Sequence, residues 1–419
     1  MAQKSVKKIF IHRFHCLNNY GTAMMGLVTI NELQKRYGDD TEFYCQCNGH
    51  SGFDEIQSEL AKPVKLANHE AKNFVKSKYK WVRSYQKRKY LIDASEVAHY
   101  DEVLVLGGDD LSEYYTHKIY RDLLQYWRWS KATKLILLGQ SIGPFERWRN
   151  RFVMKHFYKQ IPIFVRDAGS KDYLKKAFGL EKNIYQSADL AFMDLPLQSD
   201  KSIETAVLNH YDLEKKKYIT LVISGLQGKY YTTDKNAYFN AYKSLIKNIL
   251  TNKNYQDKKL VLLAHTFPPH GNEAAQIKDL VNFLKTDSFF TTDILDKIIP
   301  ITDKILATRA RFILGNGYMT VTGRMHAAIS TLQMGTPAIA LSYSAKYQGV
   351  IGLNLDRSDL IIESNESKLW ESGEIVNLIT EKMAYVTGNY ERLSNEIKHK
   401  VAIQKQLVEE TFNQIASNI

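Results

Sequence analysis

The sequence predicts an α/β protein made of two doubly wound domains that face each other across a cleft. Short, nearly continuous apolar runs alternate with amphipathic stretches along its 419 residues, as in parallel sheets covered by helices on both faces. Several apolar runs lead directly into glycine-rich or charged turns, and ligands of such sheets bind beyond the carboxyl ends of the strands. The alternation pauses in the polar segment 194–214 and then restarts, which places domains over residues 1–195 and 196–419.

The first domain begins with a predicted strand at residues 8–14. A predicted helix at residues 22–36 follows, with Ala23, Leu27 and Ile30 on one face. Further short apolar runs predict strands of this domain at residues 43–45, 103–106, 134–138 and 163–165. The second domain is expected to hold strands at residues 218–224, 260–264, 312–314 and 337–341, followed by a helical tail from residue 374 onward.

The charge and cysteine content restrict the partners and the compartment. A formal net charge of +12 favours anionic partners, such as a phosphorylated substrate, a lipid carrier, a membrane surface or nucleic acid. Three cysteines form no disulfide framework and suit a reducing compartment. The first 15 residues hold too short an apolar core for a signal peptide, and we find no apolar run of the roughly 18 residues that a membrane span needs. We expect a cytoplasmic protein, with the inner face of the plasma membrane as its place of peripheral contact.

A basic segment, residues 62–91, interrupts the alternation. It contains ten lysines and arginines, opposed only by Glu70, with five aromatic residues interleaved. This pattern fits a solvated helix at the sheet edge, contact with an anionic membrane or lipid carrier, or contact with nucleic acid. Of the ligands we favour the membrane, and we expect no nucleic-acid partner. Three tryptophans either extend this surface or pack in the core: Trp127, Trp129 and Trp148.

The most informative stretch is Gly323-Arg324-Met325-His326, between a predicted strand and a predicted helix of small and apolar residues. A helix N-terminus at a strand end binds anions through its free N–H groups. Arg324 adds a two-pronged donor for phosphate or carboxylate, and His326 is a candidate proton donor. The alternative is that His326 packs against the helix while Arg324 forms a surface ion pair.

Two further cations follow predicted strands. Lys346 comes after the strand at 337–341, and Arg166 comes after the strand at 163–165 in the other domain. Three cations and one histidine at strand ends predict a pocket for a small, highly charged anion.

The order of several short motifs resembles that of the polysaccharide pyruvyl transferases. The motifs are GGDDL (107–111), GQSIGPF (139–145), VRDAGSKDYL (165–174), SADLAF (187–192), GRMHAAI (323–329) and GTPAIALSYSAK (335–346). The resemblance extends over about residues 8–360, and its R-x-H…K, RD-x-x-S and GQSIGP elements are specific when they occur together in this order. It implies a GT-B-like fold of two Rossmann-type domains.

The resemblance also implies an activity and residue roles. Phosphoenolpyruvate would be the donor and co-substrate, with no other cofactor, and the product a pyruvate ketal on a hexose of a surface polysaccharide or its precursor. Arg324 and His326 match the family's R-x-H element, where the donor binds and the acid/base histidine lies. Lys346 matches the lysine after the next strand, and Arg166 matches the arginine of the R-[DE]-x-x-S element. Gly323 and Met325 belong to the same donor motif.

The chain departs from the family pattern at two turns on the expected acceptor side. The first turn reads Asn18-Asn19-Tyr20-Gly21-Thr22 without the usual acid, and the glycine run after residues 103–106 reads Gly107-Gly108-Asp109-Asp110. Either aspartate is a candidate to activate the sugar hydroxyl, and the alternative is that they cap a helix at 112–127. The residues that we expect on the acceptor side, whose saccharide is free or lipid-linked, are Asn19, Gly21, Gly108, Gln140, Ser141 and His265.

The scheme needs no metal ion, so none is predicted. Six other side chains are candidates for a zinc site, because three of them end the first predicted strand and three end the second: His12, His15, Cys16, Cys45, Cys47 and His50. Their spacing matches no standard zinc motif, and buried free thiols with a turn histidine explain them better.

Two other functions fit the same fold. The main alternative is a GT-B glycosyltransferase that uses a nucleotide-sugar donor. Such enzymes often hold the ribose with a carboxylate in the second domain, and after Gly323 the next acid is Asp356, which argues against it. The other alternative is a binding protein that uses the basic segment, for which the Arg324 cluster would be dispensable.

Overall fold

The computed structural model describes residues 6–15, 17–47, 50–73, 91–114, 116–269 and 271–417. The chain forms two compact units. Unit 1 comprises residues 1–16, 25–190 and 406–419, and unit 2 comprises residues 17–24 and 191–405. The change at 190/191 lies close to the predicted boundary at 195/196. Two short stretches belong to the other unit than the sequence suggests, residues 17–24 and the end of the helical tail.

Unit 1 is built on a seven-stranded parallel sheet with strand order β3-β2-β1-β4-β5-β6-β7. The strands are β1 (Lys8–His12), β2 (Glu42–Cys45), β3 (Lys65–Asn68), β4 (Glu102–Leu106), β5 (Lys134–Gln140), β6 (Ile163–Val165) and β7 (Ile184–Gln186). Phe10 in β1 pairs with Tyr44 in β2 and with Val103 in β4. The β4 strand is buried at every position, as expected for a central strand covered on both faces.

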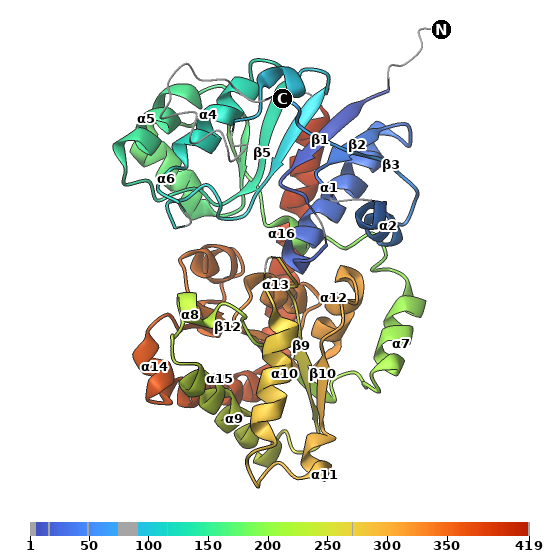
Figure 1. Ribbon diagram of the computed structural model, residues 1–419, viewed down its shortest axis with the longest axis vertical. Helices are drawn as coiled ribbons and strands as arrows, with labels where there is room; N and C mark the ends of the chain where they lie inside the picture. Colours follow the sequence, from blue (N-terminus) through green and yellow to red (C-terminus); the bar gives the residue numbers. More distant parts are fainter. Residues whose placement is uncertain are drawn as a thin grey trace. The chain divides into compact units, whose positions relative to one another are not determined.

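The helices of unit 1 flank this sheet. They are α1 (Tyr20–Tyr37), α2 (His50–Ser58), α4 (Tyr120–Trp129), α5 (Trp148–Phe157), α6 (Ala168–Phe178) and the end of α16 (Tyr390–Ala416), with a 3-10 turn at Ala94–Glu96. Figure 1 shows α4, α5 and α6 beside the β5 half of the sheet, and α1 and α2 beside the β1–β3 half. A large apolar core joins the first group to the sheet through Leu123, Trp129, Met154 and Leu174.

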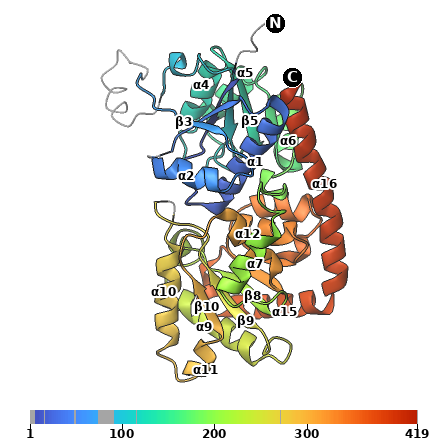
Figure 2. The same ribbon diagram turned by 90° about the vertical axis from the view of Figure 1, so that its right-hand side faces the viewer.

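Unit 2 contains a six-stranded parallel sheet with strand order β10-β9-β8-β11-β12-β13. The strands are β8 (Tyr218–Val222), β9 (Lys259–Leu263), β10 (Ile298–Ile301), β11 (Met319–Thr322), β12 (Ala338–Ser342) and β13 (Ile361–Glu363). The described helices are α7 (Lys201–His210), α8 (Gln227–Tyr230), α9 (Lys235–Thr251), α10 (Glu273–Leu284), α11 (Thr292–Leu295), α12 (Ala307–Asn316), α13 (Met325–Gln333), α14 (Ser367–Glu371) and α15 (Glu374–Gly388). Short turns of helix lie at Leu190–Phe192, Gln348–Leu353 and Ser358–Leu360. Figure 2 shows α10 on one side of this sheet and α7 and α12 on the other.

Both sheets confirm the predicted doubly wound α/β architecture. Counted within each unit, both follow the order 3-2-1-4-5-6, with one further strand at the edge of unit 1. In such sheets the chain reverses its direction of winding between the first and fourth strands, and loops diverge there to leave room for a ligand. The reversal lies between β1 and β4 in unit 1 and between β8 and β11 in unit 2.

Three local predictions are wrong. Residues 312–314 were predicted as a strand but lie in α12, a helix whose residues are buried nearly all around, so that its apolar run lacks a helical period. The first strand ends at His12 rather than at residue 14, because Arg13 takes a left-handed conformation with φ 69°. The helix predicted at 112–127 begins only at Tyr120. Asp109 and Asp110 therefore do not cap it.

Most of the basic segment 62–91 lies outside the described residues. Lys65–Asn68 at its start forms the edge strand β3. Among the helices that the structure describes, none is both long enough and apolar enough to span a bilayer. The predicted contact of this segment with a membrane stays a prediction.

Candidate active site

The candidate site of unit 2 lies at the carboxyl ends of four neighbouring strands. Ser224 follows β8, His265 follows β9, Arg324 follows β11 and Lys346 follows β12. The strand that leads to Arg324 is β11, so the position predicted for Arg324 at a strand end is confirmed. Arg324 is also the N-cap residue of α13, which puts His326 in the first turn of that helix. The two residues therefore lie at the winding reversal of the sheet, beside free helix N–H groups that favour an anion.

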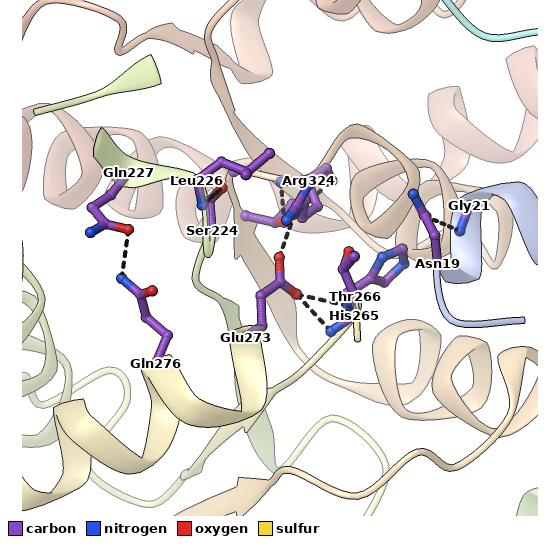
Figure 3. Close-up of polar contacts among 12 residues, drawn as sticks. Asn19, Gly21, Ser224, Leu226, Gln227, His265, Thr266, Glu273, Gln276 and Arg324 are labelled. Carbon is purple, nitrogen blue, oxygen red and sulfur yellow. Dashed lines mark hydrogen bonds and ion pairs between the residues drawn. The ribbon is translucent and has the colours of Figure 1, made fainter. Parts of the chain in front are cut away.

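Glu273, the first residue of α10, holds the site together. Its side chain is fully buried, and one carboxylate oxygen accepts a hydrogen bond from Nε of Arg324. The other oxygen accepts from the backbone N–H groups of His265 at 2.7 Å and Thr266 at 3.0 Å (Figure 3). A buried carboxylate with this many donors fixes the guanidinium relative to the β9 loop.

The corner around Arg324 comprises Arg324, Glu273, His265, Thr266 and Gly271. Three of its buried polar atoms have no hydrogen-bond partner among the described residues. They are Nη2 of Arg324, Nε2 of His265 and Oγ1 of Thr266. A Cβ atom built on Gly271 would lie 3.2 Å from that Nη2 and 3.0 Å from Cγ2 of Thr266, so a glycine leaves this side of the guanidinium uncovered. Buried polar groups are nearly always paired, and three unpaired ones together indicate a ligand site.

The turn at the start of α1 belongs to unit 2 and packs against this corner. Asn19 pairs with Thr266 in an antiparallel bridge, and the Tyr20 N–H donates to the His265 carbonyl at 3.3 Å. The Asn19 side chain accepts from the Gly21 N–H at 3.0 Å, which fixes the turn (Figure 3). Gly21 lies directly against the imidazole of His326. The structure thus brings Asn19, Gly21 and His265 to the donor motif.

The electrostatics of the corner favour a bound anion. Burial alone would lower the pKa of Arg324, but the Glu273 carboxylate, with Tyr343 and Tyr347 nearby, raises it above its usual value. Burial, with His326 and Arg324 close by, lowers the pKa of His265 well below its usual value. Arg324 is therefore cationic and His265 neutral at neutral pH, so His265 can donate one hydrogen bond without adding charge.

Lys346 lies next to tyrosine side chains of the site. Its Nζ donates to the Tyr343 hydroxyl at 2.9 Å and lies 4.6 Å from the centroid of that ring. Tyr343 in turn stacks on Tyr230 at 4.1 Å. Behind them the Tyr231 and Tyr347 hydroxyls both donate to the Gly323 carbonyl, at 3.2 and 2.8 Å, and so brace the loop before Arg324. Met325 is buried in the same loop.

Unit 1 carries a separate polar cluster at the carboxyl ends of β1 and β4. Arg13 forms ion pairs with Asp110 and Asp122, each at 3.2 Å. The Asp110 side chain is half exposed, while burial raises the pKa of Asp122 although Arg13 opposes this. Asp109 accepts a hydrogen bond at its carbonyl from the Ser112 hydroxyl at 2.7 Å, next to Gly108. The catalytic role predicted for the two aspartates stays a prediction.

The remaining predicted residues of unit 1 form a buried network. Arg166 is 1% exposed and donates to Asp189 at 2.7 Å and to the Ser141 hydroxyl at 2.9 Å. Ser141 donates to Asp167 at 2.7 Å. The Gln140 side chain donates to the Val105 carbonyl at 2.9 Å and fills the space beside Gly107. These contacts support the first sheet, and the ligand roles predicted for Arg166, Gln140 and Ser141 stay predictions.

Two thiols of unit 1 lie among the described residues, and both are buried and free. Cys45 and Cys47 have sulfur atoms 3.6 Å apart. Cys16 and the side chain of His50 lie outside the described residues. Among the side chains that the structure does describe, no group of three histidine, cysteine or acidic residues is arranged to hold a metal ion.

Sequence reasoning did not identify Glu273, Thr266 or Gly271 as site residues. The local signal for Glu273 was its place at the start of a helix after the Pro-rich loop that follows β9. An acid there ordinarily indicates a favourable helix start, and only the fold shows that it pairs with a residue 51 positions away.

The chain is similar to known proteins in sequence and in fold. A family model described as polysaccharide pyruvyl transferase matches residues 19–345, a range that includes Arg324 and His326 and ends one residue before Lys346. The amylovoran biosynthesis protein AmsJ of Erwinia amylovora is 22% identical over 318 residues, covering 74% of this chain and 71% of that protein.

Solved structures share the fold at low sequence identity. MnaA of S. aureus, in a co-structure with UDP, has a TM-score of 0.61 and 12% identity, covering 98% of this chain and 96% of its own. UDP-GlcNAc 2-epimerase from Neisseria meningitidis, bound to UDP-GlcNAc, has a TM-score of 0.60 and 12% identity, with coverage of 99% and 100%. These similarities confirm the predicted GT-B-like fold of two Rossmann-type domains.

Proposed function

Because this chain belongs to the polysaccharide pyruvyl transferase family, we propose that it moves a pyruvyl group from phosphoenolpyruvate to two hydroxyl groups of a saccharide. The product is a cyclic pyruvate ketal on a surface polysaccharide or its precursor. The observation that carries the proposal is the unpaired, buried Nη2 of Arg324 beside His326, at the winding reversal of the second sheet. The similarity to the amylovoran biosynthesis protein AmsJ supports the acceptor class.

The residues of the corner suit each part of the donor. Phosphoenolpyruvate carries a carboxylate and a phosphate. Glu273 binds Nε of Arg324, so that Nη2 of the same guanidinium can donate to one of these two groups. Thr266 and His265 supply uncharged donors from the same corner. Lys346 supplies a second cation after β12, the strand that follows β11. The N-terminus of α13 adds backbone N–H groups on the same side.

The reaction needs one proton and two hydroxyl attacks. His326 gives a proton to C3 of the enol, which makes C2 electrophilic with oxocarbenium character. One saccharide hydroxyl adds to C2 and releases its proton, and the phosphate leaves as the C2–O bond breaks. A neighbouring hydroxyl then adds to C2 and closes the ketal. Arg324 and Lys346 stabilise the negative charge of the carboxylate and the leaving phosphate. Of the two protons that the hydroxyl groups give up, one returns to His326 and the other leaves with the phosphate.

Titration calorimetry tests the donor. Phosphoenolpyruvate should bind the wild-type protein, and Arg324→Ala should weaken binding by about tenfold or more, since a charge-assisted pair contributes roughly 1.5–3 kcal/mol. Arg309→Ala, which removes an exposed arginine of α12, serves as the matched control and should leave the affinity unchanged. UDP- and GDP-sugars are titrated in parallel. A nucleotide sugar that binds while phosphoenolpyruvate does not would make this chain a glycosyltransferase.

A further inference from the structure

The α5 helix of unit 1 presents two aromatic side chains to solvent. Trp148 is 70% exposed, the largest value among the large apolar side chains that the structure describes, and Phe152 is 50% exposed. Four residues apart on a helix, they lie on one face. The opposite face is buried through Asn150, Val153 and Met154. Folding of unit 1 therefore does not account for the two exposed rings.

The same helix and its ends carry an uninterrupted positive charge. Residues 147–159 contain no acid, and five basic side chains among them are exposed: Arg147, Arg149, Arg151, Lys155 and Lys159. The Arg149 guanidinium lies 5.3 Å from the Trp148 ring centroid, so charge and aromatic surface are interleaved. Figure 1 shows α5 at the outer edge of unit 1, beside α4 and α6.

The aromatic surface continues from α5 toward α4. Phe152 lies 6.2 Å from Phe157, and Phe157 lies 4.5 Å from Trp127, measured between ring centroids. Trp127 and Phe157 line a cavity of about 460 Å³ whose wall also includes Lys131, Lys134 and Lys159. A cavity with aromatic walls and three lysines suits the phosphate end of an amphiphile.

We propose that this α5 face, defined as Trp148, Phe152 and the five basic residues around them, docks on the surface of an anionic phospholipid bilayer. Tryptophan favours the boundary between headgroups and acyl chains, and each basic residue near an anionic leaflet contributes roughly 1 kcal/mol. A helical face with exposed aromatic residues among basic ones has the character of an interfacial helix. The inference does not rest on the proposed donor chemistry, and it would bring the protein to a lipid-linked saccharide.

Vesicle flotation of the full chain tests the proposal. Vesicles of phosphatidylcholine alone are compared with vesicles that also contain phosphatidylglycerol. The wild type should float only with the anionic vesicles, and binding should weaken at high salt. Combined Trp148→Ser and Phe152→Ser changes should lower the bound fraction about tenfold or more, because two aromatic side chains lose their apolar contact. Leu353→Ser, at a 64% exposed position of unit 2, is the matched control and should have no effect.

A second variant keeps the proposal testable if the first folds poorly. Arg149→Glu with Lys155→Glu leaves the aromatic residues in place and should abolish binding to anionic vesicles. Binding that survives both variants but is lost when the lysines and arginines of 76–89 become glutamines would overturn the proposal in favour of the basic segment. If the variants differed from the wild type in sedimentation coefficient but not in vesicle binding, the α5 face would bind a second copy of the chain, and the proposal would be wrong. Phosphoenolpyruvate titration of the same variants separates this result from the donor proposal.

Discussion

Gly21 and His326 are packed so closely that the glycine position has no room for a side chain. A Cβ atom built on Gly21 would lie 2.5 Å from Cγ of His326 and 2.9 Å from its Cβ. Gly21 and His326 both belong to unit 2. The Asn19 carboxamide holds the Gly21 N–H, so the turn cannot easily retreat from the imidazole. The glycine therefore sets the position of the proposed proton donor.

Gly21→Ala should accordingly reduce turnover far more than donor affinity. The alanine methyl group displaces the imidazole, and a displacement of about 1 Å at a reacting group can cost roughly 10²-fold in rate. Turnover is measured by phosphate release and donor affinity by calorimetry. Gly228→Ala, where a Cβ would meet nothing within 4 Å, is the control. Equal losses of turnover and affinity would show that Gly21 shapes the donor pocket as a whole rather than the position of His326.

Glu273→Gln is expected to weaken both donor binding and the fold. The variant leaves the buried Arg324 without its anionic partner, which for a buried pair costs about 3 kcal/mol or more. It should also lower phosphoenolpyruvate affinity by about tenfold, because the guanidinium is no longer fixed. Chemical denaturation gives the stability change, and calorimetry gives the affinity.

Asp279→Asn on the same helix provides the comparison for Glu273. Asp279 forms a half-exposed ion pair with Lys235 at 2.8 Å, and such surface pairs contribute little to stability. Its substitution should change neither quantity measurably. If Glu273→Gln behaved like Asp279→Asn, the proposed role of Glu273 in positioning Arg324 would be wrong.

The sequence predicts that Arg324 and His326 lie between a strand and a helix, although it misassigns an element before them. Arg324 and His326 could be placed because a short loop joins a strand to a helix there, and local patterns report such junctions. The preceding α12 was mistaken for a strand, since burial on all sides removes the helical period of its apolar residues. A residue at a strand end can therefore be predicted from the local alternation of strands and helices, even where a neighbouring element is misassigned.

Pairings across the fold could not be predicted in the same way. Glu273 and Arg324 are 51 residues apart, and Asn19 reaches Thr266 across almost 250 residues. The turn of residues 17–24 belongs to unit 2, although it directly follows the first strand of unit 1. Hydrophobic periodicity contains no information on which distant loops meet. Arg166 illustrates the reverse case, because its motif predicts a ligand contact while its side chain is buried against Asp189.

His326→Gln tests the proposed proton donor directly. Glutamine keeps the size and hydrogen-bonding ability of the side chain but cannot supply a proton at neutral pH. Turnover should fall by about 10²-fold or more, with donor affinity within about threefold of the wild type. His265→Gln is the informative comparison, since His265 is neutral and contacts the same corner. A turnover loss for His265→Gln that exceeds the loss for His326→Gln would reassign the proton donor.

The acid stability of unit 1 should depend on His69. Burial lowers the pKa of His69 to about 4, and its Nδ1 lies 2.8 Å from the Tyr100 hydroxyl. The unfolded chain, with a pKa of about 6.5, binds this proton first, so stability is complete above pH 6.5 and declines as the pH falls toward 4. The loss from this one group reaches about 3 kcal/mol at pH 4.

Urea denaturation between pH 7 and pH 4 checks this dependence. His69→Gln removes the titrating group, so its unfolding free energy should decline less steeply with falling pH, whatever its value at pH 7. The exposed His399→Gln should keep the wild-type slope. Burial also lowers the pKa values of His12 and His265. These two residues contribute to the same loss of stability at acid pH, and both variants retain them. Parallel slopes for the wild type and His69→Gln would mean that His69 is not held neutral in the folded protein.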